Sequence, residues 1–381
     1  MKSNQKILVI LFILLMFITV GELGYLVYFK TQTKEHLSET NEILISEPND
    51  SISKKEKNKL IKCPEGFVLV PGDSAYKTSD FCVMKYEAKC DINNDGLGDS
   101  PKKGATWNYL KNPCQKIVSS AEGLPITNIS LTDPVTDENQ DITKSSAKRH
   151  CEVSGWHLLT NDEYMTIAKN IIESSQNWCD PMIPDKCGLE IGKGIVPSGH
   201  SNEKPDKALP ASIDDDNSCY LTGDSTDGCK SSGSQKRTFT LKNKEVIWDI
   251  AGNVWEMVDL VINVENQPSA KNASEIRTGW GWSEFYPTKD PNAWYLFDYG
   301  VLRPSDLTVS GIWWTSDLGI GKISHNSRPN VTGKVALIRG GSWNTVSNAG
   351  IFTTALVMGP YDNSLDINSA VGFRCAIKPS M

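Results

Sequence analysis

The sequence lacks the short motifs that most metal-dependent and nucleotide-dependent enzymes require. Its five histidines form no HxxxH or HxH pair, its ten cysteines form no CxxC pair, and there is no P-loop, dinucleotide fingerprint or GxSxG. Acidic pairs are numerous, but no feature selects one of them as a general acid and base. The net charge is −7, and no Lys/Arg cluster lies in the part expected to fold. We therefore exclude nucleic acid as a partner, because phosphate binding needs a basic face.

One long apolar run is present, at residues 7–29, and a helix of that length spans roughly 30 Å of hydrocarbon. A cleaved signal peptide is the alternative, but we find no small-x-small cleavage site and no cysteine placed for lipid attachment. We expect residues 1–30 to be an uncleaved transmembrane signal anchor. Residues 31–62 are charged and nearly free of aromatic residues, which predicts a disordered stalk.

All ten cysteines follow the expected anchor. An even set without metal-ligand spacing predicts a disulfide framework and an extracytoplasmic domain, anchored to the cell membrane by a single span. The alternative is several buried free thiols in a cytosolic domain. Proximity favours Cys179–Cys187 and Cys219–Cys229, and a bridge from Cys63 to Cys82 would staple a predicted hairpin. The expected disulfide cysteines are Cys63, Cys82, Cys90, Cys114, Cys151, Cys179, Cys187, Cys219, Cys229 and Cys375.

The pattern of residues 63–381 predicts an α+β domain with short strands, long loops and about two main helices. The most secure element is a helix after Thr160, because Thr160 and Glu163 form a capping-box signature. Residues 174–235 are rich in Asp, Ser, Gly, Pro and Cys, which predicts a loop-rich, disulfide-stapled insertion. The five tryptophans between residues 279 and 314 fill a core or form an exposed ligand surface, and we expect most of them to fill the core.

Six segments in order resemble the sulfatase-modifying-factor or formylglycine-generating-enzyme family, a variant of the C-type-lectin fold. They are LPITNIS at 124–130, the helix ending in Cys151, LLTNDEY at 158–164, DIAGNVWEM at 249–257, RGGSW at 339–343 and GFRCA at 372–376. Together they cover most of residues 63–379. The resemblance implies a C-type-lectin-like fold and a bridge between Cys151 and Cys375.

Two calcium sites are expected. The resemblance implies one that uses oxygen atoms of a tight loop, namely Asp249, Ala251, Gly252 and Asn253. The second follows from the residues alone, because D-x-N-x-D-G-x-x-D places loop oxygens at Asp91, Asn93, Asp95 and Asp99. The alternative for this loop is a solvated turn between Cys90 and Cys114.

The family enzymes activate oxygen with copper bound by two cysteine thiolates shortly after RGGS. Those positions are Thr345 and Gly350 here, and neither residue supplies a thiolate. We therefore expect no copper and no oxidase activity by that mechanism. An oxidoreductase with other ligands, or another enzyme on the same scaffold, is the alternative.

The segment 335–377 also resembles the variable proteins of diversity-generating retroelements, which use the same frame to display changing side chains. Mixed amide, hydroxyl and aromatic side chains on a rigid frame suit a binding surface. We therefore predict a membrane-anchored binding or display protein whose ligand is an extracellular protein or glycan. An inactive family member with an ordinary loop, and a structural envelope protein, are the alternatives. The candidate ligand-binding residues are Trp343, Asn344, Thr345, Val346, Phe352, Thr353, Leu356, Met358, Tyr361, Asp362 and Asn363.

Overall fold

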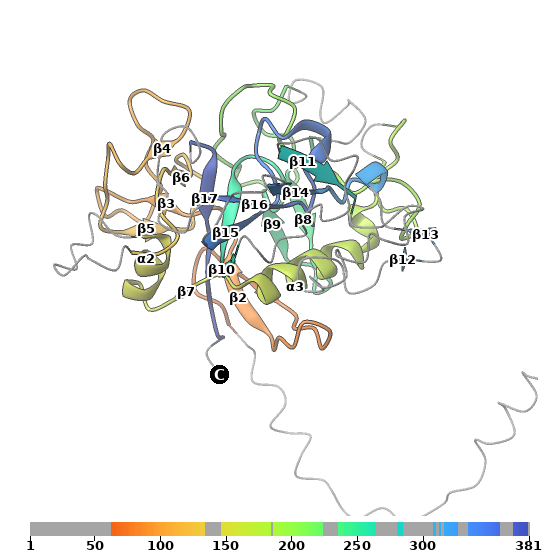
Figure 1. Ribbon diagram of the computed structural model, residues 1–381, viewed down its shortest axis with the longest axis horizontal. Coiled ribbons are helices and arrows are strands. Elements are labelled where there is room, and N and C mark those ends of the chain that lie inside the picture. Colours follow the sequence, from red (N-terminus) through yellow and green to blue (C-terminus); the bar gives the residue numbers. More distant parts are fainter. Residues whose placement is uncertain are drawn as a thin grey trace, which may run out of the picture. The chain divides into compact units, whose positions relative to one another are not determined.

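A computed structural model describes residues 62–133, 146–183, 186–223, 235–263, 280–284, 308–309, 312–313, 316–326, 334–358 and 369–379. The described residues belong to one compact unit (Figure 1). Among their helices, none has the length and apolar character needed to cross a membrane. The predicted anchor and nearly all of the predicted stalk lie outside the described residues.

Two α-helices occur in the described part of the chain, α2 (Ala147–Val153) and α3 (Asn161–Ile172). The predicted capping box at the start of α3 is confirmed: the Thr160 hydroxyl accepts a hydrogen bond from the Glu163 amide, and the Glu163 carboxylate accepts one from the Thr160 amide. This reciprocal pair satisfies donors that a helix start leaves free. Tyr164 and Ile171 of α3 are fully buried, so the helix is part of the core.

The largest sheet has six strands in the order β11-β14-β16-β15-β10-β17. Most neighbours are antiparallel, but β10 and β17, and β14 and β16, run parallel. Figure 1 shows β15 and β16 near the middle of the view, and α3 contacts the neighbouring strand β10. The strand bounds are β10 (Trp255–Asn263), β11 (Trp280–Ser283), β14 (Ile323–Asn326), β15 (Lys334–Arg339), β16 (Thr354–Met358) and β17 (Val371–Phe373).

A four-stranded sheet brings the two ends of the domain together, in the order β1-β2-β18-β7. Its first two strands form the predicted hairpin, and the predicted Cys63–Cys82 disulfide is confirmed with an S–S distance of 2.03 Å. The C-terminal strand β18 pairs with β2 and with β7. The bounds are β1 (Phe67–Val70), β2 (Phe81–Met84), β7 (His157–Leu158) and β18 (Cys375–Ile377).

The remaining elements are short. Four two-stranded pairs are β3 (Lys89–Cys90) with β5 (Ile117–Val118), β4 (Trp107–Asn108) with β6 (Ile126–Thr127), β8 (Thr238–Thr240) with β9 (Val246–Trp248), and β12 (Thr308–Val309) with β13 (Ile312–Trp313). Single 3₁₀ turns are η2 (Ser175–Asn177), η7 (Ser316–Leu318) and η8 (Val346–Asn348). The predicted α+β character, with few helices and short strands, is therefore confirmed for the described residues.

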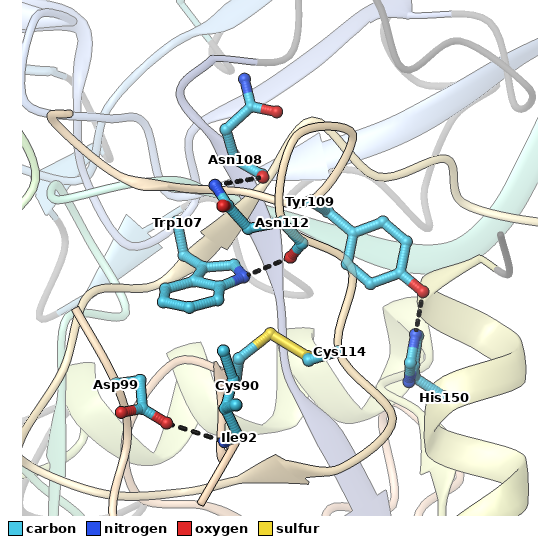
Figure 2. The surroundings of a disulfide bond; sticks show 9 residues. All are labelled: Cys90, Ile92, Asp99, Trp107, Asn108, Tyr109, Asn112, Cys114 and His150. Carbon is cyan, nitrogen blue, oxygen red and sulfur yellow. Dashed lines mark hydrogen bonds between the residues drawn. A yellow bond between two sulfur atoms is a disulfide. The ribbon is translucent and has the colours of Figure 1, made fainter. Parts of the chain in front are cut away.

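Four disulfides hold these short elements together. The predicted Cys179–Cys187 and Cys151–Cys375 bridges are both present. The fourth joins Cys90 to Cys114, and Figure 2 shows it between the loop from Ile92 to Asp99 and the Trp107–Asn112 turn. Cys219 is also oxidised, and its predicted partner Cys229 lies outside the described residues.

Candidate ligand-binding surface

The RGGSW segment begins in the core. The Arg339 side chain is fully buried, where its guanidinium donates to the Asn161 side chain and the Phe352 carbonyl and lies over the Tyr164 ring. Gly340 has φ +84°, and a Cβ atom there would lie 2.5 Å from the Ile250 carbonyl oxygen, so only glycine fits. This end of the segment is therefore part of the rigid frame.

The other end of the segment is equally fixed. Arg374, between β17 and β18, is fully buried and donates to the Glu256 carboxylate at 2.5 Å. Its remaining N–H groups donate to the Met84, Lys85 and Trp248 carbonyls. A buried charge that is paired and hydrogen-bonded is tolerated in the interior. Arg374 thereby ties β17 and β18 to β2 and β9.

Between these anchors the chain reaches the surface at residues 343–348. Asn344, Val346 and Ser347 are exposed, whereas Trp343 and Thr345 are buried at 6% and 8% exposure. The Thr345 hydroxyl accepts from the Ser342 amide at 2.8 Å and so holds the turn from below. Three side chains of this turn are therefore exposed, and the buried tryptophan and threonine support it.

Three predicted surface residues belong to the core. Phe352, Thr353 and Leu356 have no exposed area, and the Phe352 amide donates to the Ile320 carbonyl. Leu356 lies in β16, where the consecutive residues Thr354, Ala355 and Leu356 are all buried, so both faces of the strand are covered. Phe352 and Thr353 directly precede this strand and are buried with it. Met358 ends β16 and pairs through its backbone with Ala336. The other three predicted residues, Tyr361, Asp362 and Asn363, lie outside the described residues.

A second loop, residues 201–207, is hydrogen-bonded to this surface. The Val346 amide donates to the Ser201 carbonyl at 2.7 Å, and the Glu203 amide donates to the Trp343 carbonyl at 2.8 Å. The Trp343 indole N–H donates to the Asp206 carboxylate at 3.0 Å. We call residues 201–207 and 343–348 together the two-loop surface. In the sequence, residues 201–207 belong to the predicted loop-rich insertion, and no pattern connects them with residues 343–348.

The backbone of Val346 has an unusual conformation. Its φ is +55°, in the left-handed region that β-branched residues rarely adopt, and its side chain is 49% exposed. Such strain persists where the surrounding structure fixes it and is concentrated at ligand-binding and catalytic sites. Here the Ser201 carbonyl and the buried Trp343 fix the turn.

The residues of the first expected calcium site do not fit a calcium ion. Both carboxylate oxygens of Asp249 accept hydrogen bonds of 2.7 Å from Arg237, and both side chains are buried. The Asn253 side-chain oxygen accepts from the Leu209 amide at 2.8 Å, and its nitrogen donates to Glu87. The oxygens expected to bind a cation are therefore satisfied by donors of the protein. Of the other two expected ligands, Gly252 lies against the His200 backbone and the Ala251 carbonyl lies against Gly199.

The guanidinium of Arg237 takes the place that the cation was expected to fill. Besides Asp249, it donates to the carbonyls of Leu209, Pro210 and Tyr220. All five of its N–H groups thus face oxygen atoms. The β8–β9 hairpin explains this pair: Thr238 opposes Trp248, which places residue 237 opposite residue 249.

The second expected calcium loop is closed by its own hydrogen bonds. The Asp91 carboxylate accepts from the Asp95 and Gly96 amides, both at 3.1 Å, and Asp99 accepts from Ile92 at 2.7 Å (Figure 2). The Lys116 ammonium lies 2.7 Å from Asp91. Burial favours the neutral carboxyl, but the Lys116 hydrogen bond and these amides hold the pKa of Asp91 below its usual value. Asn93 hydrogen-bonds to Asp95. Within the described ranges, no group of three or more His, Cys, Asp or Glu side chains is arranged to hold a metal ion.

The two positions where the family enzymes have their copper-binding cysteines, Thr345 and Gly350 in this chain, are closely packed. Thr345 is fixed by Ser342, and a Cβ atom on Gly350 would lie 2.3 Å from the backbone carbon of Ile320 and 2.4 Å from the nitrogen of Gly321. Because real Cβ atoms do not approach backbone so closely, a cysteine at 350 would require the backbone to move. This packing leaves no room for the family's second thiolate.

No protein-family model matches the chain, and no curated protein matches it. Two solved structures are similar: the Major Tropism Determinant U1 Variant, with 12% identity and a TM-score of 0.35, and the I1 Variant, with 13% identity and a TM-score of 0.32. Each match covers 84% of this chain but only 55% and 54% of the two structures, so the chain spans about half their length. TM-scores this low do not establish a shared fold. The resemblance to sulfatase-modifying factors therefore depends on the six motifs alone.

Proposed function

We propose that this chain is a membrane-anchored, extracytoplasmic ligand-binding protein on a C-type-lectin-type scaffold. The proposal is based on the contrast in side-chain burial along residues 339–348. Arg339 is fully buried and hydrogen-bonded, and a few residues later Asn344, Val346 and Ser347 are exposed on a backbone held by Ser201. An amide, an aliphatic group and a hydroxyl on a fixed turn suit recognition, because little conformational freedom is lost when they bind.

The oxidised cysteines support an extracytoplasmic location. All nine cysteines in the described ranges are in disulfides, and such frameworks persist in oxidising compartments. The proposed anchor at residues 7–29 and stalk at 31–62 would hold the domain away from the membrane. Display of varied side chains within residues 344–370 is a further part of the proposal, and sequencing this segment in related strains tests it.

An enzyme on the same scaffold is the competing function. Its specific requirement is a reactive group near the RGGSW turn. The nearest hydroxyls, Ser342 and Thr345, hydrogen-bond to each other at 3.2 Å, and both are buried. Among the described contacts, the hydroxyls of Ser342 and Thr345 hydrogen-bond to the Ser342 amide, the Asn344 side chain and each other, and none of these groups is a base that could activate a nucleophile. Turnover of a cysteine-containing sulfatase peptide by the purified chain would support the enzyme instead.

Site-specific photocross-linking tests the binding function. The full chain carries benzoylphenylalanine at Ser347, which is exposed beside Val346, and cells bearing it are irradiated under native conditions. The control carries the same group at Ile213, which is 85% exposed on a different loop. We expect a discrete adduct from position 347 and none from 213. No adduct at 347, or equal adducts at both positions, would reject the proposal.

A further inference from the structure

Trp282, one of the five tryptophans between residues 279 and 314, presents an aromatic ring to solvent. It lies on β11, at the edge of the six-stranded sheet, and is 39% exposed. Its ring stacks on that of Trp255 in β10, with 6.2 Å between the ring centroids and 17° between the planes. Trp255 is half-buried and packs against the core. The exposed indole is therefore held by a second indole that is itself anchored in the domain.

A compensated pair of charges lies beside this ring. Glu284 follows Trp282 by two residues in extended chain, so the two side chains point to the same face of the sheet. The Lys322 ammonium lies 3.7 Å from the Glu284 carboxylate, and these side chains are 27% and 28% exposed. The Ser316 amide and hydroxyl donate to the same carboxylate at 2.8 and 2.5 Å. Because a carboxylate has about four acceptor positions, Glu284 is fixed in place and can still accept from a ligand.

These groups select a neutral ligand that has one apolar face. Glu284 and Lys322 neutralise each other, which removes the attraction for a cation or an anion. A protein interface needs a contiguous apolar centre around its aromatic anchor. Among the side chains that the structure describes on β10, β14 and β16, no large apolar one is exposed. The ring of Trp282 is thus a single apolar platform beside polar groups.

A sugar ring has the matching chemistry. The C–H groups on one face of a pyranose carry partial positive charge and pack on the electron-rich face of an indole. The hydroxyls at the rim of the sugar donate to a carboxylate and accept from an ammonium group. A ring already fixed by stacking loses little conformational freedom when the sugar binds.

We infer that Trp282, Glu284 and Lys322 form a binding site for a neutral sugar. Trp282 stacks on the apolar face of one sugar unit, and the two charged side chains hydrogen-bond to its hydroxyls. The site shares no residue with the two-loop surface, so either site can fail its test while the other stands.

Isothermal titration calorimetry of the full chain, in a detergent without a sugar headgroup, tests the site with maltohexaose, cellohexaose, chitohexaose and mannohexaose. We expect at least one of these sugars to bind with a Kd of about 1 mM or lower. Trp282→Ala should weaken that binding about tenfold, whereas Trp282→Tyr keeps a ring and should retain most of it. Lys322→Met leaves both indoles in place and should weaken binding several-fold, because it removes a hydrogen-bond donor.

Ile213→Ala is the matched control, because it removes an apolar side chain that is 85% exposed on another loop. Its affinity should equal that of the unaltered chain, and unchanged melting temperatures show that the variants fold. The inference is overturned if none of the four sugars binds, or if Trp282→Ala and Lys322→Met both bind as tightly as the unaltered chain. Binding of tetramethylammonium without binding of any sugar would show that the ring holds a cation instead.

Discussion

Arg237 and Asp249 form a bidentate ion pair inside the domain, with both N–H···O distances at 2.7 Å. The pair closes the β8–β9 hairpin and draws in the carbonyls of Leu209, Pro210 and Tyr220. Because Leu209 follows the loop 201–207, this pair also positions the base of the two-loop surface. The buried guanidinium of Arg237 therefore helps to fix the position of the loop 201–207.

Removal of the guanidinium should destabilise the domain strongly. Arg237→Met leaves Asp249 buried without its partner, and we expect a loss of about 3–5 kcal/mol in the free energy of unfolding, measured with urea. Lys148→Met is the control, because it breaks a pair with Asp259 at 2.8 Å whose side chains are 40% and 33% exposed. That loss should be at most about 1 kcal/mol. Equal losses would contradict the structural role of Arg237.

Calcium should act at the 91–99 loop and not at 249–253. We propose that this loop binds calcium and that Lys116 competes with the ion for Asp91, so Lys116→Met should enlarge the rise in melting temperature caused by calcium over EGTA. Asp91→Asn should abolish that rise. If calcium leaves the Lys116→Met variant unchanged, the loop is a solvated turn.

The Cys151–Cys375 bridge should contribute more to stability than Cys179–Cys187. The two bridges join residues 224 and 8 positions apart, and loop-closure entropy predicts about 5 and about 2.5 kcal/mol respectively. Double alanine variants compared by urea unfolding give this difference. A larger loss from the shorter loop would show that strain or residual structure dominates over chain entropy.

His150 should make the domain sensitive to acid. Burial lowers the pKa of His150 to about 4, and its Nε2 lies 2.7 Å from the Tyr109 hydroxyl (Figure 2). Between pH 6.5 and 4 the unfolded chain binds a proton that the folded chain does not. Stability therefore decreases as the pH falls through this range, by up to about 3 kcal/mol. His150→Gln should flatten this slope in urea unfolding, and an unchanged slope would assign the effect to other groups.

Local features of the sequence predicted local structure well. The capping box at Thr160 and Glu163 and the bridges Cys63–Cys82 and Cys179–Cys187 involve residues close in the chain, where spacing limits the possible partners. The misassigned residues were Phe352, Thr353 and Leu356. A strand covered on both faces shows no alternation of polar and apolar residues, so its polar neighbours in sequence suggested a surface.

The long-range pairing of the two surface loops was not visible in the sequence. The contact of 201–207 with 343–346 joins two polar segments that have no shared pattern, and only the folded chain reveals it. The guanidinium partner of Asp249 was not visible in the sequence for a related reason, since an oxygen-rich loop suits a guanidinium as well as a metal ion. Only the β8–β9 register, which places Arg237 opposite Asp249, distinguishes the two.

The strain at Val346 provides the most direct test of the binding account. Val346→Gly allows the positive φ without steric cost, so the domain should become more stable by about 1 kcal/mol. If Val346 is retained for its contact with a ligand, the same variant should lose most of the cross-linked adduct from position 347. The account predicts a higher melting temperature together with a several-fold lower adduct yield. A higher melting temperature with an undiminished adduct would contradict it.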